Sequence, residues 1–534
     1  MSLLSRFILP RLALMYGAVL LMSGCVSTTF VTDPLKLPQN STMKPVLVSM
    51  TSNTGAVNGV NQITVQRLTE AQLNGKNDFQ DTYVLMQLAP ELSRDTSFFS
   101  GALPPGEYRF YAFSDTKSRK ILRIPEGGRL LGNFVVKGDK AVDLGRLITT
   151  PVNANVVYGR SKLAASNRSL LQRFAPDYAQ LLAGDVDNGW KDATGDAGAP
   201  GSVESYALIR PVGAQCMTEL ADGRLAAASR LGTVLIRSTD GRWKTVRGPG
   251  IESLLCVTPT TEPGAELVAM GEFGTLLRKP AGVDQLLPID TGNLPAGMIT
   301  RLYGSARNGW FLSLVRGTEI LIFHSAALEA GNWSVVRKES IAHSIISGAS
   351  NYFMWPTANG FAYTVSAGPI HFYDWTSKAW TQRPTPDNAS VIGMNVSPGG
   401  VMLALTSPGG GFAGAFASIF MSRDQAVSWQ PVNTPYSIKA FPPTMTAAGT
   451  LLMAGGVFSN PELQSSKDDG RTWEHVSKYE LDRSVVALPS GQLIDYDYAQ
   501  WGLFTIRHSK DGGKTWRVEY SNYDERAFKA RYIK

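Results

Sequence analysis

The sequence is poor in metal-binding and redox-active side chains. It has three cysteines and five histidines in 534 residues. Only Cys216 and Cys256 lie beyond the N-terminal segment. Two cysteines with so few histidines form no metal-ligand cluster, so we expect neither a metal site nor a cofactor.

Charged residues are also scarce, at 18% of the chain, and the formal net charge is a modest +7. No cluster of lysine and arginine is dense enough to follow a phosphate backbone. This charge pattern argues against nucleic acid as a partner.

The apolar run at the N-terminus, Leu12 to Met22, is too short for a membrane-spanning helix, which needs about 20 apolar residues. Arg6 and Arg11 precede it, and no acidic residue occurs before Asp33. Basic residues followed by a short apolar run are typical of a secretory signal peptide.

The run ends in the segment Leu21-Met22-Ser23-Gly24-Cys25. This segment resembles the bacterial lipobox, with Met22 where the family more often has leucine. The resemblance implies that residues 1–24 are a lipoprotein signal peptide, that the Cys25 thiol is diacylated, and that its amine is acylated after cleavage. The alternative is an ordinary secreted protein with an incidental cysteine.

Val26 follows the predicted lipidation site, where aspartate tends to retain such lipoproteins at the inner membrane. We therefore expect the outer membrane as the location. Residues 25–45 are polar and contain proline, so we expect a lipidated, flexible tether spanning about 25 Å.

The remaining sequence predicts an all-β protein, because short apolar runs are separated by glycine, asparagine, aspartate and proline. Residues 46–158 alternate with a period of two, as in Ile63 to Leu68, and are expected to form a β-sandwich. Residues 103–108, Leu-Pro-Pro-Gly-Glu-Tyr, resemble the "LPPGxY" turn of prealbumin-like sandwiches.

A short helical linker is expected over residues 159–204. Six apolar residues within it fall on one helical face: Leu170, Leu171, Phe174, Tyr178, Leu181 and Leu182. Pro176 is expected to divide this stretch into two short helices, because a residue before proline is disfavoured in the helical region.

From residue 205 to 534 the chain repeats, and its tryptophans give the period. Seven repeats of 40–50 residues are expected to end near residues 243, 288, 333, 380, 429, 473 and 516. A period of this length, with four short strands in each unit, predicts a seven-bladed β-propeller.

Two repeats contain the pattern S-x-D-x-G-x-T-W without a mismatch. This pattern resembles the Asp-box, or BNR repeat, of sialidase-like propellers. Its residues are expected to be structural, with turn hydrogen bonds and a tryptophan between blades: Ser466, Asp468, Gly470, Thr472, Trp473, Ser509, Asp511, Gly513, Thr515 and Trp516.

The resemblance implies that the Asp-box is the turn between the third and fourth strands of a blade. The turns between the second and third strands must then lie on the opposite face. The side chains expected there form a candidate binding face of aromatic and charged groups: Arg230, Glu272, Phe273, Arg316, Tyr496, Asp497, Tyr498 and Trp501. A solvated rim of unrelated loops is the alternative.

Cys216 and Cys256 are 40 residues apart, close to one repeat, at the first strands of neighbouring blades. A disulfide across that seam and two separate buried thiols are both compatible with this spacing, because sequence does not fix the Cβ geometry.

Two functions follow from these features. The first is a non-catalytic binding or assembly platform for a protein or glycan, attached to the outer membrane through lipid on Cys25. The second is a sialidase-like glycoside hydrolase, in which Glu272, Tyr496 and Asp497 would be catalytic. The first is favoured because the resemblance to sialidases lacks a third arginine on this face, and Asp-boxes also occur in non-enzymatic propellers.

Overall fold

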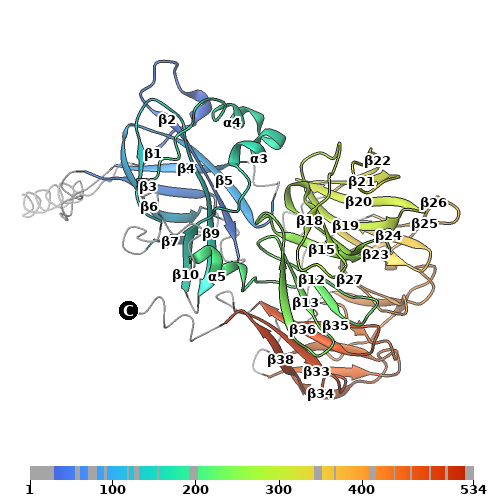
Figure 1. The fold of residues 1–534 in the computed structure, drawn as a ribbon. Coiled ribbons are helices and arrows are strands. Elements are labelled where there is room, and N and C mark those ends of the chain that lie inside the picture. Colours follow the sequence, from blue (N-terminus) through green and yellow to red (C-terminus); the bar gives the residue numbers. More distant parts are fainter. Residues whose placement is uncertain are drawn as a thin grey trace, which may run out of the picture.

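The protein has two β-rich domains joined by short helices, as a computed structural model shows (Figure 1). The structure describes residues 29–53, 60–69, 81–88, 93–116, 120–124, 131–152, 155–191, 202–341, 352–365, 368–407, 417–437, 439, 441–457, 460–479, 483–498 and 503–523. The predicted signal peptide and Cys25 lie outside these residues. None of the helices in these ranges is long and apolar enough to cross a membrane.

The N-terminal domain is a single curled sheet in the order β10-β9-β2-β5-β4-β3-β6-β7, with β1 on β4 and β8 on β6. The strands are β1 (Thr29–Val31), β2 (Lys44–Ser52), β3 (Gln62–Arg67), β4 (Thr82–Leu88), β5 (Thr96–Leu103), β6 (Gly106–Asp115), β7 (Lys120–Arg123), β8 (Phe134–Val136), β9 (Val142–Val152) and β10 (Asn155–Arg160).

The curled sheet forms a half-barrel around one apolar core rather than two separate stacked sheets. Val48, Ile63, Phe99 and Phe110 come from four different strands and meet in this core. The turn at Pro104 is fixed by Tyr108, whose Oη donates to the Pro104 carbonyl oxygen at 2.6 Å. Strand periodicity therefore predicted the all-β class, but it did not predict that the strands form one curled sheet.

Residues 29–45, expected as part of a flexible tether, are largely folded. β1 pairs in parallel with the start of β4, with Thr29 opposite Thr82 and Val31 opposite Val84. A 3-10 turn, η1 (Pro34–Lys36), follows and is capped by Asp33, whose Oδ1 accepts from the amide of Leu35 at 3.0 Å. The expectation of a free tether over this stretch is wrong because its backbone pairs with the sheet.

The helices between the domains are α3 (Asn167–Phe174), α4 (Pro176–Gln180) and α5 (Val203–Leu208). Pro176 separates α3 from α4, as predicted, and Ala175 between them has non-helical dihedral angles. The apolar face of α3 and α4 packs on Leu47 and Phe98 of the sheet and on Phe273 of the propeller.

The propeller has seven four-stranded antiparallel sheets, each built from consecutive strands. Blade one is β11 (Gln215–Glu219), β12 (Leu225–Ser229), β13 (Thr233–Arg237) and β14 (Trp243–Arg247), and blade two is β15 (Leu254–Pro259), β16 (Ala265–Gly271), β17 (Leu276–Pro280) and β18 (Leu287–Pro288). Blade three is β19 (Met298–Ser305), β20 (Gly309–Arg316), β21 (Glu319–Ser325) and β22 (Ser334–Ser340), and blade four is β23 (Tyr352–Thr357), β24 (Gly360–Val365), β25 (Ile370–Asp374) and β26 (Ala379–Arg383).

The last three blades follow the same plan. Blade five is β27 (Ser390–Val396), β28 (Met402–Ser407), β29 (Ser418–Ser422) and β30 (Gln430–Pro431). Blade six is β31 (Thr444–Met445), β32 (Leu451–Val457), β33 (Asn460–Ser466) and β34 (Glu474–Lys478), and blade seven is β35 (Arg483–Ala487), β36 (Leu493–Tyr498), β37 (Phe504–Ser509) and β38 (Arg517–Ser521). The predicted all-β class and seven blades are confirmed.

The turns between the third and fourth strands have the hydrogen bonds that their sequence favours. In blade six, Asp468 Oδ1 accepts from the Thr472 amide at 2.9 Å, and Ser466 Oγ accepts from the Gly470 amide at 2.8 Å. Blade seven repeats this pattern with Asp511 and Ser509. The hydrogen bonds from Thr472 and Ser466 lower the pKa of Asp468 to about 2, so the turn keeps its carboxylate across the neutral range.

The ring closes between blades seven and one through a buried ion pair. Arg237 Nε and Nη2 donate to the two carboxylate oxygens of Glu519 at 2.6 and 2.9 Å. Apolar side chains also pack across this seam, including Leu235 from blade one and Phe504 from blade seven. A two-bond contact between arginine and carboxylate fixes orientation as well as distance, so it holds the first blade against the last.

Candidate functional site

The turns between the second and third strands define one face of the disc, called the front face here. The turns between the third and fourth strands define the back face. Arg230 and Glu272 lie in front-face turns of blades one and two, as predicted. The N-terminal domain packs against this part of the front face (Figure 1).

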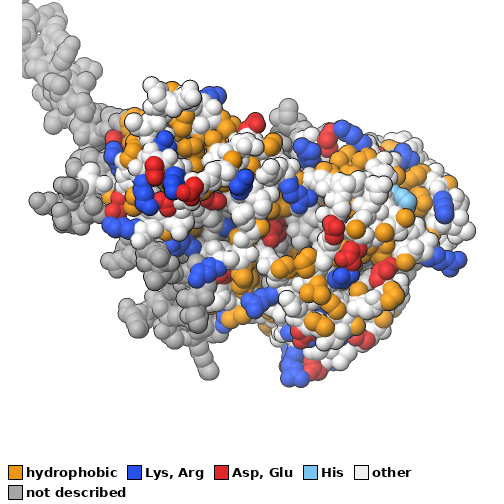
Figure 2. All heavy atoms as spheres, turned by 45° about the horizontal axis from the view of Figure 1, so that its top comes forward, with side chains coloured by type: hydrophobic (Ala, Val, Ile, Leu, Met, Phe, Trp, Pro, Cys, Tyr) orange, Lys and Arg blue, Asp and Glu red, His pale blue; other side chains and the backbone are white. Residues whose placement is uncertain are grey.

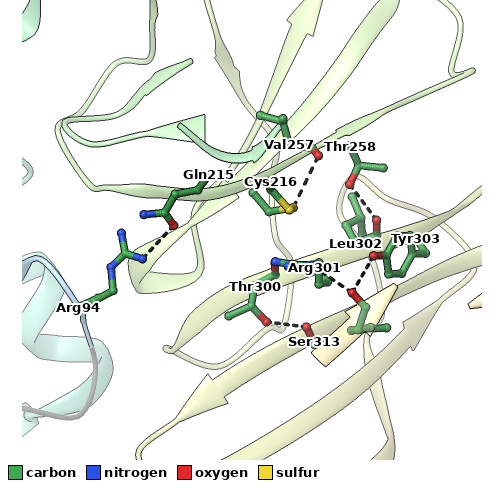
Figure 3. Close-up of a disulfide and its surroundings, with 12 residues drawn as sticks. Arg94, Gln215, Cys216, Val257, Thr258, Thr300, Arg301, Leu302, Tyr303 and Ser313 are labelled. Atoms are coloured by element: carbon green, nitrogen blue, oxygen red, sulfur yellow. Dashed lines mark hydrogen bonds between the residues drawn. A yellow bond between two sulfur atoms is a disulfide. The ribbon is translucent and has the colours of Figure 1, made fainter. Parts of the chain in front are cut away.

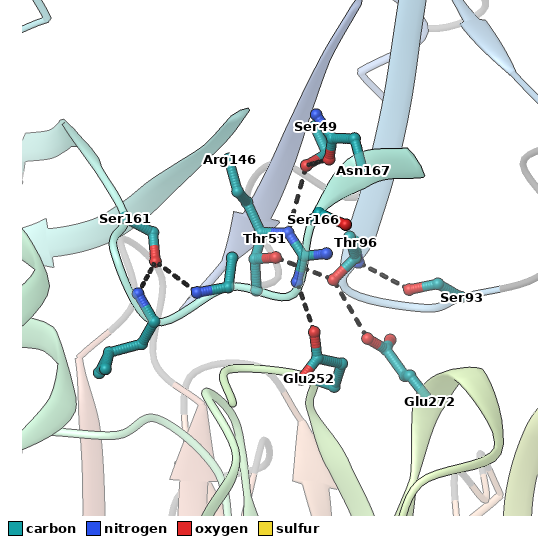
Figure 4. A network of polar contacts seen from close by, with 12 residues as sticks. Ser49, Thr51, Ser93, Thr96, Arg146, Ser161, Ser166, Asn167, Glu252 and Glu272 are labelled. Carbon is teal, nitrogen blue, oxygen red and sulfur yellow. Dashed lines mark hydrogen bonds and ion pairs between the residues drawn. The ribbon is translucent and has the colours of Figure 1, made fainter. Parts of the chain in front are cut away.

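Glu272 is the most deeply placed of the predicted face residues and has no solvent exposure. Its Oε1 accepts from the backbone amides of Arg94 at 2.8 Å and Asp95 at 2.6 Å, and its Oε2 accepts from Thr96 Oγ1 at 3.2 Å. All three donors belong to the N-terminal domain, and Figure 4 shows the contact from Thr96. Burial raises the pKa of Glu272 to about 7, and the neighbouring Asp95 carboxylate adds to the rise.

Arg230 joins the same cluster from blade one. Its Nε lies 3.1 Å from Asp95 Oδ2, and its Nη1 donates to the Val212 carbonyl oxygen at 3.0 Å. Burial opposes ionisation of Asp95, but Arg94 and Arg230 outweigh it and lower the pKa of this carboxyl. Arg94 also donates to Gln215 Oε1 at 2.8 Å (Figure 3). The cluster is therefore an ionic joint between domains.

Phe273 supplies the apolar part of this joint. Its ring stacks on Phe174 of α3 at 5.6 Å between centroids and meets Phe98 of β5 edge-on at 5.9 Å. Arg173 Nη1 donates to the Phe273 carbonyl oxygen at 2.9 Å. The positive φ of Phe273, 55°, is held by these contacts on both sides.

A second ionic contact lies beside the first. Arg146 of β9 is 2% exposed, and its Nη1 donates to Glu252 Oε1, between blades one and two, at 2.8 Å. Arg146 Nε donates to Ser49 Oγ at 3.2 Å, and Ser49 donates in turn to Asn167 Oδ1 (Figure 4). Buried charges need such partners because desolvation penalises them strongly.

The interpretation of the whole front face as a ligand site is therefore wrong for Arg230, Glu272 and Phe273. Their side chains are buried, and each contacts a residue that precedes the propeller: Glu272 and Arg230 contact Asp95, and Phe273 contacts Phe98. No local pattern indicated Arg94 and Asp95 as partners of Glu272 and Arg230, because they lie far away along the chain.

The remaining predicted residues are distributed differently. Arg316, at the end of β20, is exposed on blade three. Tyr496 lies within β36 rather than in a turn, and it packs into the core between blades seven and one. Asp497 and Tyr498 end the same strand, but their side chains and the whole of Trp501 lie outside the described residues.

The catalytic arrangement expected for a hydrolase is not assembled by the described residues. Glu272 is bound by three donors of another domain, and Tyr496 belongs to the seam between two blades. The Glu272 and Tyr496 side chains therefore do not meet at a solvent-exposed site on the front face.

The part of the front face near blade three carries exposed charges that sequence reasoning missed. Lys338 and Glu319 pair at 2.5 Å close to Arg316 in strand register. Beside them, Tyr363 Oη donates to Glu339 at 2.7 Å, and the His371 ring stacks on Tyr363 at 4.6 Å. Of these three contacts, the one between Tyr363 and Glu339 joins blades four and three, whereas the other two each lie within one blade.

Described residues of the propeller line two cavities, among others. One, of about 410 Å³, lies between α3 and blades one and two, with Arg173, Glu252 and Thr275 among its lining residues. The other, of about 500 Å³, lies between blades two and three and includes Trp310 and Leu328. Among the residues described by the structure, no group of histidine, cysteine, aspartate and glutamate side chains could hold a metal ion.

Of the two alternatives for the cysteines, a disulfide or two separate thiols, the structure shows the disulfide. Cys216 of β11 and Cys256 of β15 are bonded, with their Cα atoms 4.8 Å apart (Figure 3). These are the innermost strands of blades one and two. The covalent link therefore joins the two blades that carry the N-terminal domain.

No family model matches the chain, and no curated protein matches its sequence. Solved structures with some likeness include YCF48 bound to a D1 peptide, with 15% identity, coverage of 50% of this chain and 81% of that chain, and a TM-score of 0.36. The WD40 beta propeller domain of Doa1 has 16% identity, coverage of 57% and 98%, and a TM-score of 0.36.

An ancestral GH74 enzyme has 11% identity, coverage of 59% of this chain and 48% of that chain, and a TM-score of 0.38. The propeller fold rests on the seven sheets of the chain itself.

Proposed function

We propose that the protein is a non-catalytic binding platform, anchored in the outer membrane by lipid on Cys25, that binds a protein partner through the uncovered part of its front face. The observation that carries this proposal is the use of Glu272 and Arg230 as a buried joint between domains. A joint of this kind fixes the propeller relative to the domain that follows Cys25.

The electrostatic character of the surface also supports a protein partner. Acidic and basic side chains are intermixed on the face shown in Figure 2, without a large patch of one sign. Exposed Arg316 lies on the uncovered part of the front face, and arginine is enriched in protein interfaces. The Asp-box resemblance supports the same proposal, since its turns on the back face make structural hydrogen bonds.

The anchor is tested by Cys25→Ser in the full-length protein. We expect the wild type in the outer-membrane fraction, with the mass of three acyl chains on the N-terminal peptide. The variant has no thiol to acylate, and one or no chain does not hold a protein stably at a membrane. Recovery of Cys25→Ser in the outer membrane, in the same amount as wild type, would contradict lipid anchoring.

The binding face is tested by photo-crosslinking in cells with a reactive residue at position 316 or at position 242. Arg242 is an exposed back-face residue in blade one and serves as the matched control. We expect one discrete protein adduct from position 316 and none from position 242. Arg316→Glu should raise the Kd for the partner about tenfold, which corresponds to roughly 1.4 kcal/mol of binding free energy.

The control charge reversal, Arg242→Glu, should leave partner binding unchanged. Equal adducts from both positions would show that the front face is not the binding surface. Adducts with polysaccharide instead of protein would replace the protein partner by a glycan.

A further inference from the structure

The first strand of the N-terminal domain presents large apolar side chains to solvent. All three residues of β1 are exposed. Phe30 is 39% exposed, Val31 is 59% exposed, and Leu35 of η1 is 42% exposed. Three such side chains within six residues differ from single exposed apolar residues, which are normal on protein surfaces.

These residues are held in place by the sheet. The Phe30 ring stacks on Tyr83 of β4 with 5.3 Å between centroids, and Thr29 Oγ1 lies 3.0 Å from Thr82 Oγ1. The Ala102 amide of β5 donates to the Thr32 carbonyl oxygen at 3.2 Å. The sheet therefore holds the backbone of β1 in place, while its apolar side chains keep the exposure given above.

The distance to the proposed lipid is short. Phe30 is five residues after Cys25, and five extended residues reach at most about 17 Å. The headgroup region of each leaflet is on the order of 6 Å thick. Because β1 is already part of the sheet, no long tether can keep these side chains away from the membrane.

We propose that Phe30, Val31 and Leu35 form a membrane-contacting patch that inserts among the lipid headgroups beside the acylated Cys25. This proposal rests on the lipid anchor of the proposed function. Phenylalanine and leucine are typical of surfaces that enter the headgroup boundary. Lys36 beside them is 82% exposed and pairs with Asp33 at 3.3 Å.

The patch sets the orientation of the whole protein. β1 lies on the side of the N-terminal domain away from the propeller (Figure 1). With β1 on the bilayer and the domains joined by buried ion pairs, the propeller projects away from the lipid surface. The membrane and the protein partner then occupy opposite ends of the molecule.

The experiment places an environment-sensitive fluorophore on Val31→Cys in the full, acylated lipoprotein. Cys216 and Cys256 are bonded to each other, and acylation blocks Cys25, so the new thiol is the reactive one. The probe is a vesicle of phosphatidylethanolamine and phosphatidylglycerol containing headgroup-level spin-labelled lipid. We expect loss of most of the fluorescence through quenching.

The matched control is Val335→Cys, because Val335 is 51% exposed on the outer strand of blade three. Its fluorescence should be unchanged by the labelled lipid. Addition of Phe30→Ser and Leu35→Ser to the Val31→Cys protein should abolish the quenching, which shows that the fluorophore itself does not drive insertion.

Three results would overturn the patch. An unquenched label at position 31 in vesicle-bound, acylated protein would refute the patch and leave the lipid anchor standing. A blue-shifted but unquenched label would show that a protein surface, such as a second copy of the chain, covers these residues. An N-terminal peptide without acyl chains would overturn the anchor and the patch together.

Discussion

Replacement of Glu272 by alanine is expected to lower the free energy of unfolding by about 3 kcal/mol, because buried donors left without an acceptor cost about 1–3 kcal/mol each. The substitution removes the acceptor of the Arg94 and Asp95 amides and of Thr96 Oγ1. It also removes a carboxylate from the cluster around Arg230. Chemical denaturation measures the change in stability.

Hydrogen exchange gives a second and more local measurement. The amides of Arg94 and Asp95 should exchange much faster in Glu272→Ala, because their acceptor is gone. Glu329→Ala is the control, since Glu329 is half exposed and pairs with Arg278 at the surface, where an ion pair contributes about 0–1 kcal/mol. A smaller loss from Glu272→Ala than from this control would contradict the buried joint.

The conservative variant Glu272→Gln separates the acceptor role from the charge. The pKa of Glu272 is about 7 in the folded protein, above its ordinary value of 4.5. The folded state therefore holds this proton more tightly than the unfolded state. The resulting stability is full below pH 4.5 and is lost as the pH rises through about 7. Glutamine cannot titrate, so Glu272→Gln should not show this fall.

Removal of the disulfide by the double substitution Cys216→Ala and Cys256→Ala is expected to lower the free energy of unfolding by about 4 kcal/mol. The bond closes a loop of 40 residues. Closing a loop of this length lowers the conformational entropy of the unfolded chain, which stabilises the folded state by about 4 kcal/mol. Alanine is chosen because both sulfur atoms contact the apolar core between blades, where serine would bury a hydroxyl group.

Reduction provides the internal comparison for the disulfide. A reducing agent should shift the wild-type denaturation midpoint toward that of the double variant and should leave the double variant unchanged. Equal midpoints for the oxidised wild type and the double variant would show that the bond adds no stability. A reductant effect of the same size in the variant would assign the loss to another cause.

The architecture of the propeller could be predicted because it follows from local sequence patterns. Trp243, Trp473 and Trp516 mark the start of the outermost strands, and each repeat supplies its own four strands. The break at Pro176 is equally local, since proline restricts its own neighbour. Position 288, which lacks a tryptophan, still ends a blade at β18 (Leu287–Pro288).

The candidate site could be predicted only in part. The turns of Arg230 and Glu272 were assigned to the front face because strand order dictates it. Asp95 contacts the residues of both turns. Its contact with Glu272 joins residues 177 positions apart in the sequence, and no periodicity encodes such a contact. Tyr496 was misplaced because β36 continues to Tyr498, beyond the expected start of the turn.

The stretch over residues 29–45 could also be predicted only in part. Its polar composition suggested a free tether, yet β1 pairs with β4, more than 50 residues away in sequence. The sequence by itself determined the all-β class, the seven repeats and the spacing of the two cysteines, because these depend on near neighbours and on composition. Only the tertiary structure decided that three of the eight residues of the expected binding face belong to a joint between domains, and that the side chains of Phe30, Val31 and Leu35 are exposed, because packing between distant segments determines which surfaces remain exposed.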